Sequence, residues 1–363
     1  MVPPRDFVDV RSPSEYRLEL EPQSRFELID VNRLIASSDP LFETYPKAVY
    51  CSYHTTAGYL EQNFCDRLRH DAEAVGHYVE AFRKLFPPGA DYRHDQLDLR
   101  GELSDSQRLV EPKNADSHLT YIGSGLGSCV TYENRPDEPV FFVELDGIVE
   151  SQRRRRTTTV LGYNRSSVER AVVREIPVSA HPMDSINLRS PTLGLYDELN
   201  EIVRELGITR GRIDVSLHHA ERNTGLTVNE YETLLIRDDL VDVLQNPMRF
   251  VARKGYNMLR DPRAVPAKAK NYAKYDLVRA VNKFIDKTGL NESLVERVVD
   301  KFLSVPASRF LRMKRGISLL VADPDSTGRG EIIQGTYQSP ILVQWRKSPG
   351  GTRRLNVSFV RFQ

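Results

Sequence analysis

The hydrophobic pattern of the first half changes from a strand period to a helix period. Apolar side chains alternate between Lys47 and Tyr53, which predicts a strand with one buried face. From Phe64 to Phe86 they recur every three or four positions, which predicts one long amphipathic helix. Further short strands are predicted at 128–132, 140–145 and 157–161. The order in this half is therefore strand, helix and a group of strands.

The second half repeats this order. An amphipathic helix from Leu195 to Leu206 ends at Gly207, a common C-terminal cap residue, and a strand follows at 213–219. Further strands are predicted at 317–322, 331–336, 341–345 and 355–360. The segment 50–64 aligns with 215–232, and 152–163 aligns with 352–362. We therefore predict two copies of one module, at 1–165 and 166–363.

The second copy is longer, because the shift from Gly58 to Gly225 is smaller than the shift from Arg154 to Arg354. The extra sequence is assigned to 246–304, where two amphipathic patterns predict a helical hairpin. The fold class is α/β in the α+β sense: two tandem modules, each a mostly antiparallel sheet layered with helices, with a helical insertion in the second.

Composition and charge narrow the class of protein. A chain of 363 residues with 40% hydrophobic content can bury a substantial core, and its net charge of +1 gives no global attraction for nucleic acid or an anionic membrane. No apolar run approaches the roughly 18 residues of a membrane span. Cys51, Cys65 and Cys129 are an odd number without CxxC spacing, which disfavours a disulfide framework and a thiolate zinc site. We expect a cytoplasmic protein that binds neither nucleic acid nor membrane.

A run of four arginines, 153–156, invites a nucleic-acid interpretation. On a strand, however, alternate side chains point to opposite faces, so at most two of the four share a surface. A solvated or salt-bridged sheet edge is therefore favoured. His70 and His77 lie on one face of the predicted long helix but two turns apart, too far for joint metal ligation, and are expected at the surface.

Several ordered motifs resemble the YjbQ family, also called UPF0047 or the secondary thiamine-phosphate synthase family. The first copy carries HTTAG (54–58), YRH (92–94) and NADSHL (114–119), and the second carries GLTVNE (225–230) and GTYQ (335–338). Each copy lacks what the other keeps. Gln62 and Asn63 stand where the family has Asn-Glu, and Glu221 stands where the second copy would have the first histidine. The resemblance covers most of the chain outside 246–304.

The resemblance implies one composite site shared by the two copies. His54, His94 and His118 would face Asn229, Glu230 and Gln338. Three neutral imidazoles with an open fourth position are a zinc ligand set, so a divalent metal, zinc, is the expected cofactor. Glu230 would be the general acid or base, and Asn229, Gln338 and Asn114 would complete the catalytic set. The hydroxyls of Thr55 and Thr56 and the close approach allowed by Gly58 would hold a phosphate.

Plainer interpretations of the same residues remain open. His94 and His118 fall in predicted loops, where a lone histidine is more often solvent-facing than metal-bound. Glu230 would begin a predicted helix at 230–244, where an acid favours the helix dipole without catalysis. The second copy could also keep its motifs only for packing.

At the level of function, the resemblance implies a metal-dependent enzyme acting on a small phosphorylated or anionic substrate, with thiamine-phosphate synthase as the nearest named activity. The alternative is a non-catalytic ligand-binding or assembly protein with degenerate sites. Because single-module relatives are known as trimers, a homo-oligomer is also expected.

Overall fold

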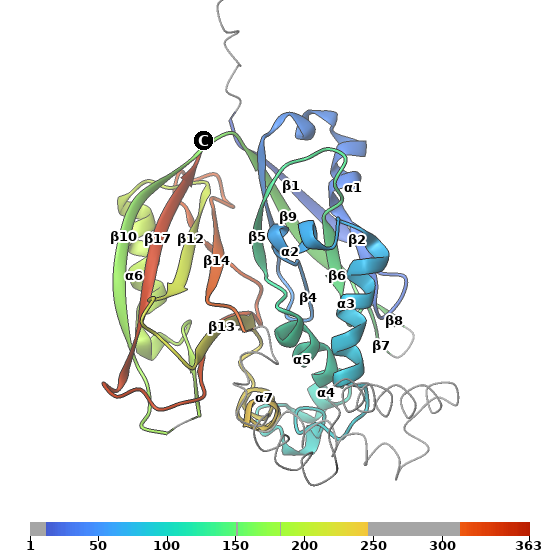
Figure 1. Cartoon of the computed structure of the whole chain (residues 1–363), viewed down its shortest axis with the longest axis vertical. Coiled ribbons are helices and arrows are strands. Elements are labelled where there is room, and N and C mark those ends of the chain that lie inside the picture. The colour runs from blue at the N-terminus through green and yellow to red at the C-terminus, as the bar shows by residue number, and fades with distance from the viewer. Residues whose placement is uncertain (1–11, 150–151, 182, 246–312) are drawn as a thin grey trace, which may run out of the picture.

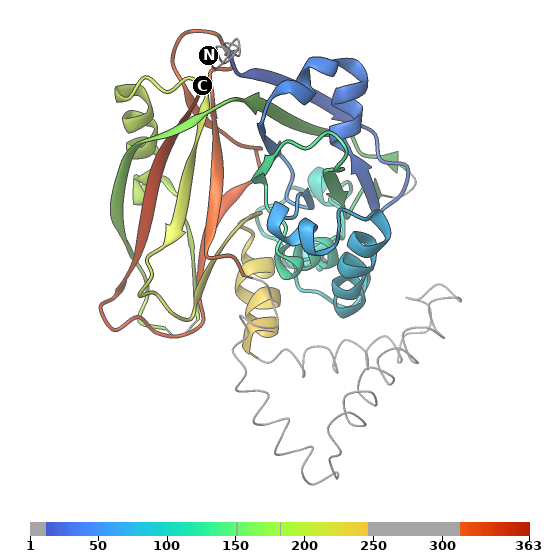
Figure 2. The same cartoon turned by 45° about the horizontal axis from the view of Figure 1, so that its top comes forward.

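The structure is a computed structural model that describes residues 12–149, 152–181, 183–245 and 313–363. The predicted helical insertion at 246–304 lies outside these residues. Two lobes lie side by side, one formed by the first module and one by the second (Figure 1). Turning the molecule shows that each lobe has its own twisted sheet (Figure 2).

The first module contains two main antiparallel sheets and a short hairpin. Its larger sheet has the order β1 (Ser14–Leu20), β9 (Arg156–Tyr163), β3 (Lys47–Ser52), β5 (Cys129–Glu133). Its smaller sheet has the order β2 (Glu27–Asp30), β6 (Phe141–Glu144), β4 (Ala57–Gly58), and the hairpin is β7 (Ile148–Val149) with β8 (Gln152–Arg153). The strand predicted at 47–53 is confirmed as β3, but both of its faces are buried because helices cover one and the second module covers the other.

The helices of the first module are α1 (Val31–Ser38), η1 (Pro40–Thr44), α2 (Gln62–Arg67), α3 (Ala72–Leu85), η2 (Leu97–Leu99), α4 (Asp105–Arg108) and α5 (Ala115–Ser124). The prediction of one long helix over 64–86 is wrong. The chain breaks after α2, where Arg69 and His70 both have left-handed φ values of 57° and 51°. Asp71 then caps α3, and its carboxylate accepts a hydrogen bond from the Ala74 N–H at 2.8 Å.

The second module repeats the arrangement. Its larger sheet has the order β10 (Ser166–Pro177), β17 (Thr352–Phe362), β12 (Gly211–Leu217), β14 (Gly316–Ala322), β15 (Glu331–Ile333). Its smaller sheet has the order β11 (Asp184–Asn187), β16 (Ser339–Gln344), β13 (Thr224–Asn229). Its described helices are η3 (Pro191–Leu193), α6 (Leu195–Glu205), η4 (Leu234–Asp239) and α7 (Leu240–Gln245).

The two modules share one topology. The order β1-β9-β3-β5 is matched by β10-β17-β12-β14, and β2-β6-β4 is matched by β11-β16-β13. A buried arginine occupies the same place in both copies. It is Arg156 in the first copy and Arg353 in the second, so the alignment of Arg154 with Arg354 made from the sequence is wrong by three residues. Arg156 donates to the carboxylate of Glu144 at 2.9 Å, and Arg353 donates to the side-chain oxygen of Gln344 at 3.1 Å. The duplication predicted from the sequence is therefore visible in strand order and in side-chain contacts.

The modules are joined by apolar contacts in two places. Leu235, Ile236 and Leu240 of the second module belong to the hydrophobic core of the first. Between the two larger sheets, the rings of Tyr163 and Phe362 stack with centroids 4.1 Å apart. These contacts fix the second module's β13–η4 segment against the first module, and that segment carries Asn229 and Glu230.

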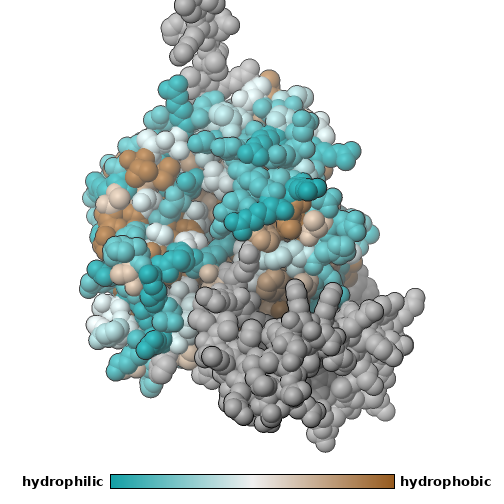
Figure 3. Space-filling model, viewed as in Figure 1, coloured by the Kyte–Doolittle hydropathy of each residue, from teal (hydrophilic) through white to brown (hydrophobic). Residues whose placement is uncertain are grey.

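One surface feature bears on association. The edge strand β10 exposes Val168 and Val173, and Figure 3 shows hydrophobic surface gathered over the lobe that contains this strand. The homo-oligomer stays a prediction.

Among the described residues no helix is both long and apolar enough to span a membrane.

Candidate functional site

Six of the ten predicted site residues line a cavity between the two modules: His54, Thr55, Thr56, Asn114, His118 and Glu230. Its volume is about 430 Å³. The first module contributes the loop after β3, the start of α5 and the arginine run, and the second contributes the residue after β13 and an exposed tyrosine. The lining includes Tyr53, His54, Thr55, Thr56, Glu111, Pro112, Asn114, His118, Arg154, Arg155, Arg156, Glu230 and Tyr337.

His118 lies on α5 rather than in the loop that the sequence predicted. Every residue of this helix is buried, so its sequence lacks the one-sided apolar stripe that identifies a surface helix. The Nδ1 atom of His118 lies 2.8 Å from Oδ1 of Asn229 in the second module. Asn229 donates its own Nδ2 to the Thr55 carbonyl at 2.9 Å, so its oxygen faces the imidazole. His118 therefore carries its proton on Nδ1 and presents the Nε2 lone pair to the cavity.

Glu230 faces that lone pair. Its Oε2 lies 3.6 Å from His118 Nε2, and its Oε1 lies 3.5 Å from a guanidinium nitrogen of the buried Arg100. Burial raises the pKa of Glu230, partly opposed by the positive charges of His94 and Arg100. Burial, followed by the charge of His94, holds the pKa of His118 well below its usual range. The carboxyl of Glu230 therefore keeps a proton more readily than an exposed glutamate does, and the imidazole of His118 takes one up less readily than an exposed histidine does.

The predicted helix at 230–244 begins later than expected, because η4 starts at Leu234. The acid that serves the first turn is Glu232, whose carboxylate accepts the N–H groups of Leu234 and Leu235 at 2.8 and 2.7 Å. The helix-dipole interpretation of Glu230 is therefore wrong, and its carboxylate is left facing the cavity.

His94 is held as a cation. Its Nδ1 lies 2.9 Å from Oε2 of Glu232, and its Nε2 lies 3.3 Å from Oδ1 of Asn114. Asn114 donates its Nδ2 to Asp146 at 2.7 Å, so both imidazole nitrogens of His94 face acceptors and both carry protons. Burial opposes this charge, but the hydrogen bond to Glu232 and the charge of Glu230 raise the pKa of His94 overall.

His54 also lines the cavity. Its Nε2 accepts the Thr157 N–H at 2.8 Å, so its remaining proton is on Nδ1. Burial and the charges of Arg156 and Arg154 lower the pKa of His54 to about 3. Gln338 secures the loop from the second module, with its Nε2 donating to the carbonyls of Ser52 and His54 at 2.9 Å. Gln338 does not line the cavity.

These contacts do not fit the predicted three-histidine zinc set. His94 has no free lone pair, and the Nε2 lone pair of His54 already accepts an amide hydrogen. Within the described ranges, the one group of three or more His, Cys, Asp or Glu residues with ligand atoms within 4.8 Å of one another is Asp66, His70 and Glu138. His54, His94 and His118 do not form such a group among the described residues, and a zinc site on these three histidines stays a prediction. His118 alone of the three presents a free lone pair to the cavity.

Two of the three predicted phosphate-binding residues line the cavity, and the third does not. Thr55 and Thr56 line the cavity, and Oγ1 of Thr56 accepts a hydrogen bond from Arg156 at 3.2 Å. Gly58 belongs to β4 and does not line the cavity. A Cβ at this position would lie 2.6 Å from the Gly127 carbonyl oxygen, so its glycine is required by strand packing.

The side chains of the arginine run alternate between paired and exposed positions, as expected for a salt-bridged sheet edge. Arg156 is buried against Glu144, and Arg154 contacts Asp146 at 2.8 Å. Arg155 stays largely exposed, with 83% of its side chain accessible. Nε of Arg154 is buried without a hydrogen-bond partner among the described residues. The cavity thus has one cationic wall.

Sequence reasoning missed four residues that shape the site. Glu232 and Asp239 of the second module hold the His94 segment, with Asp239 accepting the His94 N–H at 2.9 Å. Arg100 anchors Glu230, and Tyr337 lies exposed at the cavity. The sequence held one signal, for Glu232. In NEYE (229–232) this second glutamate comes two residues after Glu230, which belongs to the motif that resembles the YjbQ family.

Comparisons with known proteins bear on the fold. No protein-family profile matches the sequence, and no curated protein matches it. Among solved structures, the chain is similar to a YbjQ-like protein of unknown function from Sulfolobus solfataricus, with 15% identity, 54% of this chain and 99% of that chain covered, and a TM-score of 0.29. It is also similar to an uncharacterized conserved protein of the YjbQ/UPF0047 family from Clostridium acetobutylicum, with 15% identity, coverage of 52% and 98%, and a TM-score of 0.27.

A third similar structure is a conserved hypothetical protein from Thermus thermophilus, with 14% identity, coverage of 53% and 99%, and a TM-score of 0.26. Over about half of this chain, the similarity is to structures described as YbjQ-like or as members of the YjbQ/UPF0047 family. The descriptions of these proteins name no activity, so the similarity brings none with it.

Proposed function

We propose that this chain is an enzyme that carries out general acid–base chemistry on a small phosphorylated or otherwise anionic substrate in the cavity between its two modules. The observation that carries this proposal is the 3.6 Å separation between His118 Nε2 and Glu230 Oε2 across the module boundary. That distance is too long for a direct hydrogen bond, but one oxygen of a substrate or of a water molecule can lie beside the pair, within hydrogen-bonding distance of both groups, and exchange a proton with either.

The environments of the pair assign the two roles. The pKa of Glu230 is raised by burial, so its carboxyl group keeps a proton more readily than an exposed glutamate does. The pKa of His118 is lowered by burial and by His94, so its Nε2 stays free to accept a proton. One group thus has a proton to give and the other has a lone pair to receive one, which are the two roles in general acid–base catalysis. Glu230 is therefore the acid and His118 the base.

The preference for an anion follows from the remaining walls. Arg154 and Arg155 line the cavity, and the cationic His94 lies behind His118 with ring centroids 5.3 Å apart. The Thr55 and Thr56 segment adds two hydroxyls on the same side. A small anion would gain charge-assisted hydrogen bonds there, and these are stronger than neutral ones. No step of this proposal uses a metal, because two of the three predicted imidazole ligands are already committed to protein partners.

The experiment has two stages. Untagged protein is denatured and its small-molecule extract is analysed by mass spectrometry. The recovered anions and a panel of phosphorylated metabolites are then offered to wild-type protein and to Glu230→Gln. Removal of a general acid costs roughly 100- to 10,000-fold in turnover. We expect Glu230→Gln to lose turnover on this scale while retaining ligand binding.

The matched control is Glu102→Gln, because Glu102 also contacts Arg100, at 2.7 Å, but lies outside the cavity. Its turnover should stay within about twofold of wild type, since exposed ion pairs contribute little. Wild-type protein that binds its anion without converting it would overturn the proposal in favour of a binding protein. Equal turnover in wild type and Glu230→Gln would remove Glu230 from the chemistry.

A further inference from the structure

A second group of ionisable side chains lies in the first module, apart from the cavity. Asp66 comes from the end of α2, His70 from the break before α3, and Glu138 from the loop between β5 and β6. Their ligand atoms all lie within 4.8 Å of one another. None of the three lines the cavity between the modules.

The imidazole of His70 has the orientation that a metal ligand needs. Its side chain is only 5% exposed, and its Nδ1 lies 3.1 Å from the Pro139 carbonyl oxygen. A carbonyl only accepts, so Nδ1 carries a proton. Nε2 donates to the two carboxylates, 2.9 Å from Asp66 and 3.3 Å from Glu138, and a cation bound there would take the place of the hydrogen that Nε2 donates. An Nδ1–H bonded to a backbone carbonyl is the usual support for an imidazole that binds a metal through Nε2.

The backbone is arranged to place this ring. Two consecutive residues, Arg69 and His70, adopt left-handed φ values, which cost a non-glycine residue roughly 1–2 kcal/mol each. Without this break the helix would continue in phase from α2 into α3. The break turns the His70 side chain inward toward Pro139, whereas His77 on α3 stays 76% exposed.

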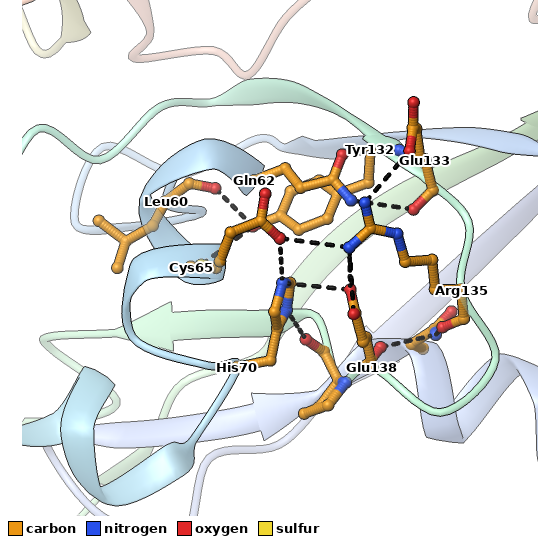
Figure 4. Close-up of polar contacts among 11 residues, drawn as sticks. Leu60, Gln62, Cys65, His70, Tyr132, Glu133, Arg135 and Glu138 are labelled. Atoms are coloured by element: carbon orange, nitrogen blue, oxygen red, sulfur yellow. Dashed lines mark hydrogen bonds and ion pairs between the residues drawn. The ribbon is translucent and has the colours of Figure 1, made fainter.

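The surrounding charge is unbalanced. Figure 4 shows the guanidinium of Arg135 beside Glu138 and Glu133. Its Nη1 lies 3.0 Å from Glu138 and 3.4 Å from Asp66, and its Nη2 lies 3.2 Å from Glu133. Three carboxylates therefore share one guanidinium and one imidazole. Binding of a cation at Nε2 releases the hydrogen that this nitrogen donates, and the group is then left with a net negative charge of two, which a divalent cation balances.

We propose that Asp66, His70 and Glu138 form a binding site for a divalent transition-metal cation such as Zn²⁺. One imidazole nitrogen and two carboxylate oxygens with open positions for water are a ligand set that Zn²⁺ accepts. Arg135 occupies the carboxylates when no cation is bound and withdraws toward Glu133 when one is. The bound cation joins α2, the helix break and the β5–β6 loop, so it stabilises the outer side of the first module.

The test uses the full chain, purified without a tag and stripped with a chelator, and titrates it with Zn²⁺ and with Co²⁺. Wild type should bind one equivalent that Asp66→Asn and Glu138→Gln lose. The loss should exceed the roughly 10- to 100-fold effect of removing an outer partner of a metal site. Arg135→Gln should bind several-fold more tightly, because a competing cation is gone.

His77→Ala is the matched control, because His77 forms a similar i,i+4 pair with Glu73 at 4.0 Å but is exposed and meets one carboxylate. Its Zn²⁺ affinity should equal that of wild type. Asp66 and Glu138 are 42% and 33% exposed, so their variants should fold, and thermal unfolding checks that they do. No saturable binding by wild type, or one equivalent that Asp66→Asn keeps and His118→Ala loses, would overturn the proposal.

Discussion

His118 and Asn229 come from different modules, and the Nδ1 atom of the imidazole donates a hydrogen bond to Oδ1 of the amide over 2.8 Å. The same amide oxygen accepts the Glu230 N–H at 2.9 Å, and its Nδ2 holds the Thr55 carbonyl. One side chain of the second module thus fixes the tautomer of a histidine in the first. The chemistry of the cavity therefore depends on the contact between the modules.

The first prediction concerns the protonation of His118. Asn229→Asp replaces the amide by a carboxylate, which favours the imidazolium, so the pKa of His118 should rise from its lowered position. NMR of ¹⁵N-labelled histidine measures this directly. Wild-type His118 should stay neutral with its proton on Nδ1 in mildly acidic buffer, whereas the variant should titrate there. Asn63→Asp adds the same charge at an exposed position and should leave His118 unchanged. A wild-type His118 with an ordinary titration would contradict the assignment.

The second prediction concerns the buried pair of His94 and Glu232, whose side chains are 1% and 5% exposed. The pKa of His94 is raised, so its contribution to stability is present below the unfolded pKa of histidine and is lost as pH rises through the folded pKa. The pKa of Glu232 is lowered despite the opposing effect of burial, so its contribution is present above its unfolded pKa and is lost as pH falls through the folded pKa. The pair should therefore stabilise the fold most in mildly acidic solution.

Glu232→Gln tests this pair. Removing one partner of a buried ion pair costs about 3 kcal/mol of unfolding free energy. Urea unfolding in mildly acidic buffer should show a loss of this size, and the loss should shrink in alkaline buffer, where His94 is neutral in both proteins. Glu80→Gln breaks a partly exposed pair with Arg83 and should cost less than about 1 kcal/mol. A penalty for Glu232→Gln that does not change with pH would mean that His94 is not charged.

The third prediction concerns the contact that holds the His54 loop. A Cβ at Gly335 would lie 1.9 Å from the Tyr53 carbonyl oxygen, so Gly335→Ala must displace the turn that carries Gln338. Overpacking of this kind costs about 2 kcal/mol, and the variant should also bind the substrate anion more weakly. Gly350→Ala is the control, because the nearest atom lies 4.0 Å away. Urea unfolding and ligand titration measure both effects, and equal behaviour of the two variants would exclude a close contact at Gly335.

The sequence predicted much of the fold for a physical reason. Strands such as β3, β12 and β14 carry continuous or alternating apolar runs, and the duplication keeps the same runs at matching places in both copies. The sequence also predicted that His118, Asn229 and Glu230 lie in one site, because each copy lacks the motif that the other keeps. These features depend on local periodicity and on residue identity, both of which are readable in one chain.

What the sequence did not predict depends on contacts between distant residues. His94 is a cation because Glu232 and Asn114 accept from its two nitrogens, and Glu232 belongs to the other module. Residue spacing carries no information on which ring nitrogen has a partner, so the zinc interpretation treated all three imidazoles as free. The buried helix α5 was missed because burial on all sides removes the amphipathic stripe.

The break between α2 and α3 gives the last prediction. The apolar stripe continues in phase across it, so periodicity alone indicates one helix, although Asp71 is a good N-cap residue. Arg69 is exposed and has a φ of 57°, a conformation that glycine adopts without the steric cost of a Cβ. Arg69→Gly should therefore raise the unfolding free energy by about 1 kcal/mol, net of the greater flexibility of glycine in the unfolded chain.

The matched control lies two residues earlier. Arg67 is also exposed but belongs to α2, so Arg67→Gly should lower stability by about 0.5–1 kcal/mol. Urea unfolding of the two variants should then give shifts of opposite sign from the same substitution type. A destabilised Arg69→Gly, comparable to Arg67→Gly, would mean that the helix continues through residue 69 and that His70 is not turned toward Asp66 and Glu138 in solution.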